Sequence, residues 1–334
     1  MNLMHFLPVL VAFVVSLACL WVLLLPAGRR LLLDRPNARS LHEKPVPRSG
    51  GIAILAGIVA GIAASTADMN YAIASTLGIA LALAAISLVD DVFVLPALIR
   101  LAAHLAAAAA AMAILIGVAE PLRFALLALA VAWYANLYNF MDGSDGLAGG
   151  MAVFGFGAYA WAAHQAGHAA LVTASASIAV ASFAFLLLNF HPARLFMGDV
   201  GSVPLGFLAG ALGVLGWRDG AWPLWFPILV FAPFVCDATL TLAKRLLRGE
   251  RVWQAHREHY YQRLVRMGFG HRGAAGIEYL AMTGCVATAL LARTAEPSIQ
   301  AGALGASAIA LTAVAVWIDL RWARLRGMPE EARQ

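Results

Sequence analysis

The sequence carries little charge. Only 12% of its 334 residues are Asp, Glu, Lys or Arg, and 62% are hydrophobic. A soluble globular domain carries about 25% charged residues, so an ordinary soluble domain is excluded. Apolar runs of about 20 residues recur along the chain, and a bilayer requires such runs of its spanning helices. We therefore predict an all-α integral membrane protein.

Cysteine is also scarce and gives no pattern. Cys19, Cys236 and Cys285 lie in apolar segments without CxxC spacing, so neither a disulfide framework nor a cysteine zinc site is indicated. His256 and His259 are three residues apart, a spacing found in zinc sites. No cysteine or other third zinc ligand lies near them in the sequence, so a zinc site is not indicated. We interpret the cysteines as small buried hydrophobic residues.

The apolar runs predict eleven membrane spans in a single polytopic domain covering residues 1–334. The breaks between them fall at Pro, Gly and charged residues. The predicted spans are 3–27, 50–67, 71–89, 97–118, 122–140, 146–164, 168–189, 203–217, 222–243, 273–293 and 299–320. No charge precedes the first run, whereas a signal peptide needs a positively charged start, so we expect this run to be retained as a helix.

The distribution of Lys and Arg predicts the orientation. With a periplasmic N-terminus and a cytoplasmic C-terminus, 20 of the 23 basic residues fall on the cytoplasmic side. Cytoplasmic loops of membrane proteins carry this excess. The net charge of +5 mostly reflects this bias and gives no reason to expect nucleic-acid binding.

Polar motifs gather on the predicted cytoplasmic side. They occupy loops near 28–49, 90–96, 139–146, 189–202 and 244–272. Their carboxylates are Asp90, Asp91, Asp142, Asp145 and Asp199. Single aspartates could be helix caps or solvated turns, but five at one interface indicate function, because charge near hydrocarbon is costly.

The chemistry of these loops suits phosphate and a divalent cation. Carboxylate oxygens are ligands that Mg²⁺ prefers, with water and substrate phosphates completing its shell. Glycines flank the aspartates and allow phosphate to approach the backbone closely. Lys44, Arg48, His256 and His259 supply positive charge, and the alternative is that this charge binds lipid headgroups alone. Asp237, inside the ninth predicted span, could line the cavity or pair with Lys244 or Arg245.

These motifs resemble one family, the polyprenyl-phosphate N-acetylhexosamine-1-phosphate transferases, which includes the enzyme that makes lipid I. The resemblance covers nearly the whole chain in matching order, and it is closest to the branch that initiates O-antigen. The motifs are HEKPVPRSGG, VDDVF, NLYNFMDGSDGLAGG, NFHPARLFMGDVGS and HREHYYQRL. The last departs from the consecutive histidines of the lipid I enzyme, which favours a different sugar.

The resemblance implies roles for individual residues. Asp199 would bind Mg²⁺, or Mn²⁺ in its place, and Asp90 and Asp91 would lie beside the lipid phosphate. Asp142, His256 and His259 complete the expected catalytic set. The expected substrate-binding set is Lys44, Arg48, Asn139, Asp145 near the uracil, Asn189, and Phe196 stacking on the base.

The implied reaction moves N-acetylhexosamine-1-phosphate from a UDP-sugar to undecaprenyl phosphate and releases UMP. It would take place at the cytoplasmic face of the bacterial inner membrane, among membrane lipids, as the first step of O-antigen or a related surface polysaccharide. We favour direct attack by the lipid phosphate, with a phospho-enzyme as the alternative. The sugar stays open among GlcNAc, GalNAc, QuiNAc and FucNAc, as does the oligomeric state, a homodimer included.

Two other classes of membrane protein compete with this hypothesis. A transporter would place carboxylates at mid-span with access to both faces, and only Asp237 is a candidate for such depth. A CDP-alcohol phosphotransferase needs a DGxxAR run with further spaced aspartates, which MDGSDGLAGGMAVFG lacks.

Overall fold

The computed structural model describes residues 6–28, 32–34, 45–65, 69–252, 254 and 256–326. Within these ranges almost the whole chain is helical. The helices are α1 (Leu7–Leu23), α2 (Gly50–Ala63), α3 (Tyr71–Phe93), α4 (Ala97–Leu115), α5 (Pro121–Phe140), α6 (Leu147–Gln165), α7 (Ala169–Asn189), α8 (Asp199–Arg218), α9 (Trp225–Val230), α10 (Ala232–Leu247), α11 (Tyr260–Leu264), the π-helical turn η3 (Val265–Phe269), α12 (Gly270–Ala292) and α13 (Pro297–Arg326). Strands β1 (Leu33–Asp34) and β2 (Val46–Pro47) pair antiparallel.

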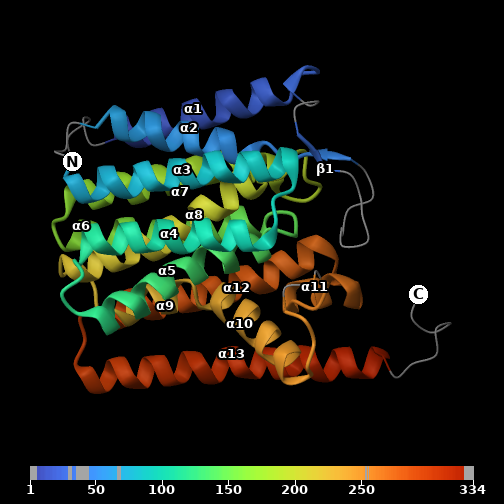
Figure 1. The fold of residues 1–334 in the computed structure, drawn as a ribbon. Helices are drawn as coiled ribbons and strands as arrows, with labels where there is room; N and C mark the ends of the chain where they lie inside the picture. The colour runs from blue at the N-terminus through green and yellow to red at the C-terminus, as the bar shows by residue number, and fades with distance from the viewer. Residues whose placement is uncertain are drawn as a thin grey trace.

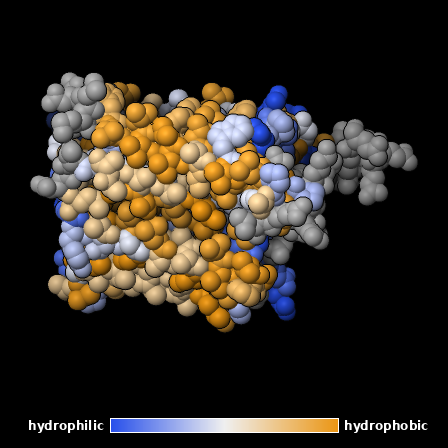
Figure 2. Space-filling model, turned by 90° about the horizontal axis from the view of Figure 1, so that it is seen from above, coloured by the Kyte–Doolittle hydropathy of each residue, from blue (hydrophilic) through white to orange (hydrophobic). Residues whose placement is uncertain are grey.

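The predicted membrane architecture is confirmed in outline. Seven helices in the described part of the chain are long and apolar enough to cross a membrane, and α1 and α2 are shorter apolar helices. The protein is therefore a multi-pass helical membrane protein, whereas the count of eleven spans stays a prediction. Figure 2 shows apolar side chains over the middle of the molecule and hydrophilic ones toward both ends, as a bilayer requires.

The structure corrects three boundaries that matter for the site. The ninth predicted span is two helices, α9 and α10, which meet at Phe231. Pro233 in the first turn of α10 explains the break, because proline lacks an N–H and its ring displaces the preceding helical carbonyl. Helix α3 continues through Asp90 and Asp91 to Phe93, and α8 begins at Asp199, so these aspartates lie on helix ends.

Successive long helices run in opposite directions along the bundle (Figure 1). The C-terminal ends of α3, α5 and α7 therefore lie at the same end of the molecule as the N-terminal ends of α4, α6 and α8. Strand β1 and helix α11 lie at that end as well. All the described polar motifs are thus brought to one end of the bundle, which we call the motif end.

Helix α8 forms the centre of the bundle and α13 lies at its edge. In α8, 94% of the most apolar window is buried, against 6% in α13. The main core of buried side chains extends from Leu20 to Ala289, and a smaller cluster joins α11, α12 and α13 around Leu264 and Ile318. Asp199 therefore begins the most firmly packed helix of the protein.

Candidate functional site

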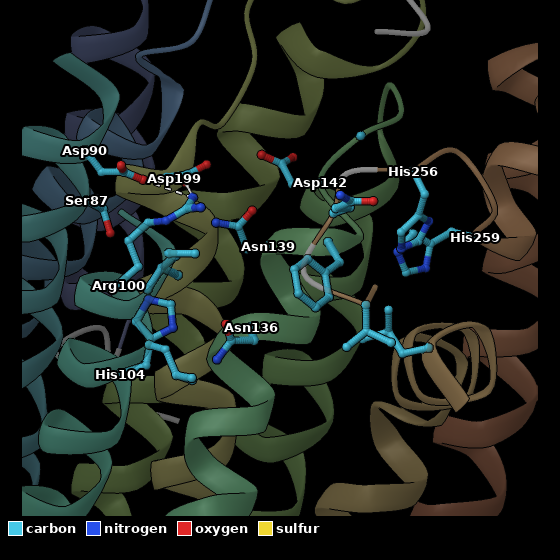
Figure 3. A pocket seen from close by; sticks show the side chains of 18 of the residues that line it. Ser87, Asp90, Arg100, His104, Asn136, Asn139, Asp142, Asp199, His256 and His259 are labelled. Carbon is cyan, nitrogen blue, oxygen red and sulfur yellow. Dashed lines mark hydrogen bonds and ion pairs between the residues drawn. The ribbon is translucent and has the colours of Figure 1, made fainter. Parts of the chain in front are cut away.

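A cavity of about 490 Å³ opens at the motif end of the bundle. Its walls come from α3, α4, α5, α8 and α10, from the turn after α5, and from the segment that leads into α11. Its polar lining includes Ser87, Asp90, Arg100, His104, Asn136, Asn139, Asp142, Asp199, His256 and His259, which Figure 3 shows around a common space.

Six of the twelve candidate residues line this cavity. They are Asp90, Asn139, Asp142, Asp199, His256 and His259. They come from four of the five predicted polar loops, although up to 169 positions separate them in the chain. The fold thus brings together the side chains on which the predicted chemistry depends, and their individual roles stay predictions.

Arg100 lies between two of the carboxylates. Its Nη1 is 3.3 Å from Oδ2 of Asp90 and 4.0 Å from Oδ2 of Asp199. The other carboxylate oxygen of Asp90 accepts a hydrogen bond from the backbone N–H of Leu95 at 2.6 Å. Since the Arg100 side chain is 43% exposed, it can reach a ligand in the cavity as well as these partners.

Asp91 and Arg48 form a pair beside the cavity and do not line it. Nη1 of Arg48 is 3.3 Å from Oδ1 of Asp91, and its Nη2 donates to the Asp91 carbonyl at 2.5 Å. Oδ2 of Asp91 is buried and has no hydrogen-bond partner among the residues that the structure describes. This ion pair ties Arg48, just after β2, to the end of α3, and the substrate-binding role of Arg48 stays a prediction.

The turn before Asp199 needs glycine. Gly198 has a φ of +73°, and a Cβ there would lie 2.5 Å from the carbonyl oxygen of Arg48. Hydrogen bonds hold the same turn, because the Gly50 and Gly51 amides donate to the Phe196 and Met197 carbonyls, each at 2.9 Å. Arg48 and the start of α2 therefore fix the position of Asp199.

Asp142 follows α5 and lies among other carboxylates. Burial, and then the negative charge of Asp199, raise the pKa of Asp142 well above its ordinary value. Carboxylates crowded in this way repel one another, and a bound cation relieves the repulsion. The electrostatics of the cavity therefore favour positive charge beside Asp142 and Asp199.

The two histidine rings lie next to each other, tilted by 31°, at the side of the cavity formed by the segment before α11. Their ring centroids are 4.9 Å apart. Burial, together with the His259 ring and the Arg245 guanidinium, lowers the pKa of His256 from 6.5 to about 4. Glu258 anchors this segment by accepting from Arg248 at 2.5 Å, with Arg245 at 3.7 Å. His256 is therefore neutral at pH 7.

The remaining candidates lie elsewhere. Asp145 is buried and meets Nδ1 of His191 at 2.6 Å, while the Ala193 amide donates to it at 3.1 Å. Asn189 accepts from the Gly146 amide and donates to the Leu195 carbonyl. Phe196 is half-buried and is not part of the cavity wall. The two hydrogen bonds of Asn189 join the turn before α6 to the segment before α8, a structural role that the sequence did not predict. Lys44 lies outside the described residues.

Asp237 fits neither of the alternatives left open by the sequence. It does not line the cavity, and it pairs with neither Lys244 nor Arg245. Its Oδ1 instead lies 3.0 Å from Nδ1 of His259, and Lys244 contacts Asp319.

The sequence analysis missed Ser87, Arg100 and His104. Ser87 lies one helical turn before Asp90, and His104 lies one turn after Arg100, so each pair shares a helix face. The sequence did contain a signal for them: each is a single polar residue in an apolar helix, three or four positions from another residue of the site. His104 is buried, and its Nδ1 has no hydrogen-bond partner in the described structure.

The donor set suits a hard cation held mainly by its substrate. Among the described residues no three His, Cys, Asp or Glu side chains stand close enough to hold a metal by themselves. Mg²⁺ needs only one or two carboxylates when water and phosphate complete its shell. Asp199 and the crowded Asp142 line the cavity and are carboxylates of this kind.

The fold and the cavity define a class: a polytopic helical membrane protein with an acidic, arginine-containing site at one end. Comparison with known proteins identifies the family within this class. Residues 73–216 match the family described as "Glycosyl transferase family 4".

Relatives match over most of the chain. It is 30% identical over 294 residues to the protein of Bacillus subtilis (strain 168) named "Probable undecaprenyl-phosphate N-acetylglucosaminyl 1-phosphate transferase", with 81% of each chain covered. It is 28% identical to the decaprenyl-phosphate N-acetylglucosaminephosphotransferase of Mycobacterium leprae, over 88% of this chain and 85% of that one. A phospho-N-acetylmuramoyl-pentapeptide-transferase of Staphylococcus aureus is 32% identical over 44% of this chain and 46% of its own. The chain belongs to glycosyl transferase family 4, in the superfamily of polyprenyl-phosphate N-acetylhexosamine-1-phosphate transferases.

Proposed function

We propose that the protein transfers N-acetylhexosamine-1-phosphate from a UDP-sugar to undecaprenyl phosphate and releases UMP. The observation that carries the proposal is the convergence of Asp90, Asp142, Asp199, Arg100 and two histidines around one cavity at the motif end. Relatives whose names describe the transfer of N-acetylglucosamine phosphate to undecaprenyl or decaprenyl phosphate support it. The motif end then faces the cytoplasm, where nucleotide sugars are available.

The cavity offers both an apolar and a charged wall. Leu83, Ile86 and Leu101 line it together with the carboxylates, and Ile86 and Leu101 are also exposed on the flank of the bundle. A polyprenyl chain can therefore remain against α3 and α4 while its phosphate reaches Asp90 and Arg100. This arrangement suits an acceptor that cannot leave the bilayer.

A divalent cation fits the same site. Asp199, with Asp142 beside it, would hold Mg²⁺, or Mn²⁺ in its place, and the ion would neutralise diphosphate charge when bound. The Arg100 guanidinium lies between Asp90 and Asp199 and donates to phosphate oxygens. His259 faces the same negative diphosphate charge from the opposite wall of the cavity.

Direct attack accounts for the reaction with the fewest steps. An oxygen of the lipid phosphate attacks the β-phosphorus of the UDP-sugar, and the bond from that phosphorus to the bridging oxygen breaks. UMP leaves with the bridging oxygen. Holding the two phosphates in line removes about 7–11 kcal/mol of barrier. The lipid phosphate is already ionised near pH 7, so no strong base is required, and Asp90 serves to orient the acceptor.

The alternative path uses a carboxylate nucleophile that displaces UMP, which leaves an aspartate carrying the sugar-1-phosphate through its phosphorus. Rapid quenching of the protein with a β-³²P-labelled UDP-sugar separates the two paths. Direct attack predicts no label on the protein at any time, and an acid-stable label on an aspartate during turnover would overturn it.

The substrate is tested by incubating purified protein with undecaprenyl phosphate, Mg²⁺ and UDP-GlcNAc, UDP-GalNAc, UDP-QuiNAc or UDP-FucNAc. We expect UMP and a lipid-linked sugar from at least one of them. Product formation from a CDP-alcohol with release of CMP would contradict the proposal. A role in initiating O-antigen or a related polysaccharide follows if loss of the gene removes that polymer and the active enzyme restores it.

A further inference from the structure

Asp237 is a buried carboxylate that the proposed reaction does not yet use. It lies in α10, 4% exposed. Oδ1 accepts from the Tyr260 amide at 3.0 Å and from the Thr241 hydroxyl at 3.1 Å, and it meets Nδ1 of His259 at 3.0 Å. Oδ2 accepts from the Tyr261 amide at 3.0 Å. One carboxylate thus joins α10 to the start of α11 and to a histidine of the cavity.

The His259 ring is held by more than this contact. It stacks with Phe140 at 6.1 Å and 28°, and with Tyr261 at 5.9 Å and 19°. Its backbone N–H donates to the Gln262 side chain at 3.2 Å. The ring is only 5% exposed, so its orientation is set by these neighbours and by the nitrogen that faces Asp237.

The contact determines which nitrogen can serve a ligand. An ionised carboxylate only accepts hydrogen bonds, so the hydrogen between the two groups lies on Nδ1 of His259. His259 lines the cavity, and Nε2 is the ring nitrogen that does not face Asp237. A proton on Nε2 makes the ring a cation, and the adjacent Asp237 carboxylate balances that charge.

We infer that Asp237 is a positioning residue of the transfer reaction: it holds His259 so that Nε2 donates to a phosphate oxygen of the substrate. The inference rests on the proposed function. It gives Asp237 a task through His259 in addition to its hydrogen bonds to the first amides of α11. A purely structural Asp237 would do no more than stabilise α11.

Asp237→Asn is the principal variant. The amide keeps the shape and leaves one oxygen for the Tyr260 amide and the Nδ1 hydrogen, but it removes the charge that balances the ring. We expect kcat to fall about 10–100-fold, the range typical of partners that orient metal-binding histidines. The KM for the UDP-sugar should change by less than about threefold, because ground-state binding is retained.

A double-mutant cycle tests whether Asp237 acts through His259. In a His259→Gln background, Asp237→Asn should cause almost no further loss of kcat, because the interaction that it disrupts is already gone. Thr241→Val is the matched control: it removes a hydrogen bond to the same oxygen without touching His259, and we expect it to keep kcat within about twofold of the parent. An equal loss from Asp237→Asn in both backgrounds, or no loss in either, overturns the inference.

A spectroscopic measurement keeps the test independent of turnover. The ¹⁵N spectrum of histidine-labelled protein, with the His259 signals assigned by their absence in His259→Gln, should show a protonated Nδ1. A bare Nδ1 refutes the contact even if Asp237→Asn does not fold. If the native protein makes no lipid product from any UDP-sugar, the proposed function fails. The inferred role in transfer then falls with it, while the spectrum still decides whether the contact exists.

Discussion

Adjacent residues in this protein can have different tasks, because consecutive side chains project from a helix in different directions. Asp90 and Asp91 are consecutive on α3, yet Asp90 lines the cavity beside Arg100 while Asp91 pairs with Arg48. Consecutive side chains of an α-helix point about 100° apart, so both cannot face one ligand equally. The resemblance assigned both aspartates to the lipid phosphate, and the structure places only Asp90 at the cavity.

Asp199→Asn should abolish turnover and leave the protein folded in the membrane, because the substitution removes a charged oxygen ligand without changing volume. Detergent-solubilised protein should keep its elution profile and melting temperature while lipid-product formation falls at least about 100-fold. Asp219→Asn, at the opposite end of the same helix, is the matched control and should keep full activity. Mg²⁺-dependent turnover in Asp199→Asn would remove Asp199 from the metal site.

His256 should make the fold sensitive to acid. Its pKa is about 4 in the folded protein and 6.5 ordinarily, so the unfolded chain binds the proton more readily. The stability that this difference contributes is complete above pH 6.5 and is lost as the pH falls toward 4. The melting temperature of the native protein should therefore fall more between pH 7 and pH 5 than that of His256→Gln. Equal falls would show that His256 does not carry this effect.

At the scale of elements, the position of Asp199 depends on a close contact between α2 and α8. Gly51 and Gly201 meet in the first turns of these helices, and a Cβ on Gly51 would lie 2.4 Å from both the Cα and the N of Gly201. Backbone atoms cannot rotate away from such a clash. The small residues therefore allow the starts of α2 and α8 to pack directly against each other.

Gly51→Val should displace the start of α8. We expect a loss of about 1–3 kcal/mol in stability from overpacking. Activity should fall about 100-fold if Asp199 moves by about 1 Å. Gly78→Val, in α3, is the control, because no atom of the described residues lies within 4 Å of a Cβ there. If Gly51→Val is as stable and active as Gly78→Val, the α2–α8 contact does not position the site.

Elements with a strong apolar signal were predictable, and their interruptions were not. Runs of about 20 apolar residues located the long helices, since burial in a bilayer leaves little choice of structure. The break at Phe231 lay inside such a run, and the local sign of it was Pro233. Arg100 and His104 were missed because their importance comes from α3, α5 and α8, which pack beside them in the fold. The partners of Asp145, Asn189 and Asp237 likewise come from distant segments.

At the scale of the whole molecule, the alternating direction of the helices places the described polar motifs together at one end of the bundle. The described polar motifs share the motif end, as the count of charged residues and the order of the spans predicted. The proposed reaction requires this arrangement, because the acceptor stays in the bilayer while the donor comes from the cytoplasm.

Accessibility labelling tests the orientation. In a variant without its native cysteines, Ala166→Cys lies at the end opposite the motifs and Arg194→Cys lies at the motif end, both at exposed positions. A membrane-impermeant maleimide applied from the periplasmic side should label position 166 and reach position 194 only after permeabilisation. The reverse pattern would place the cavity in the periplasm and remove its access to nucleotide sugars.

The central claim is that the cavity transfers a sugar together with its phosphate. The most direct test uses undecaprenyl phosphate, Mg²⁺ and the accepted UDP-sugar labelled with ³²P at the β-phosphate. We predict that the label enters the lipid product in equal amount to the UMP released. Label retained on released UDP, with unlabelled sugar on the lipid, would show transfer of the sugar alone and would contradict the account.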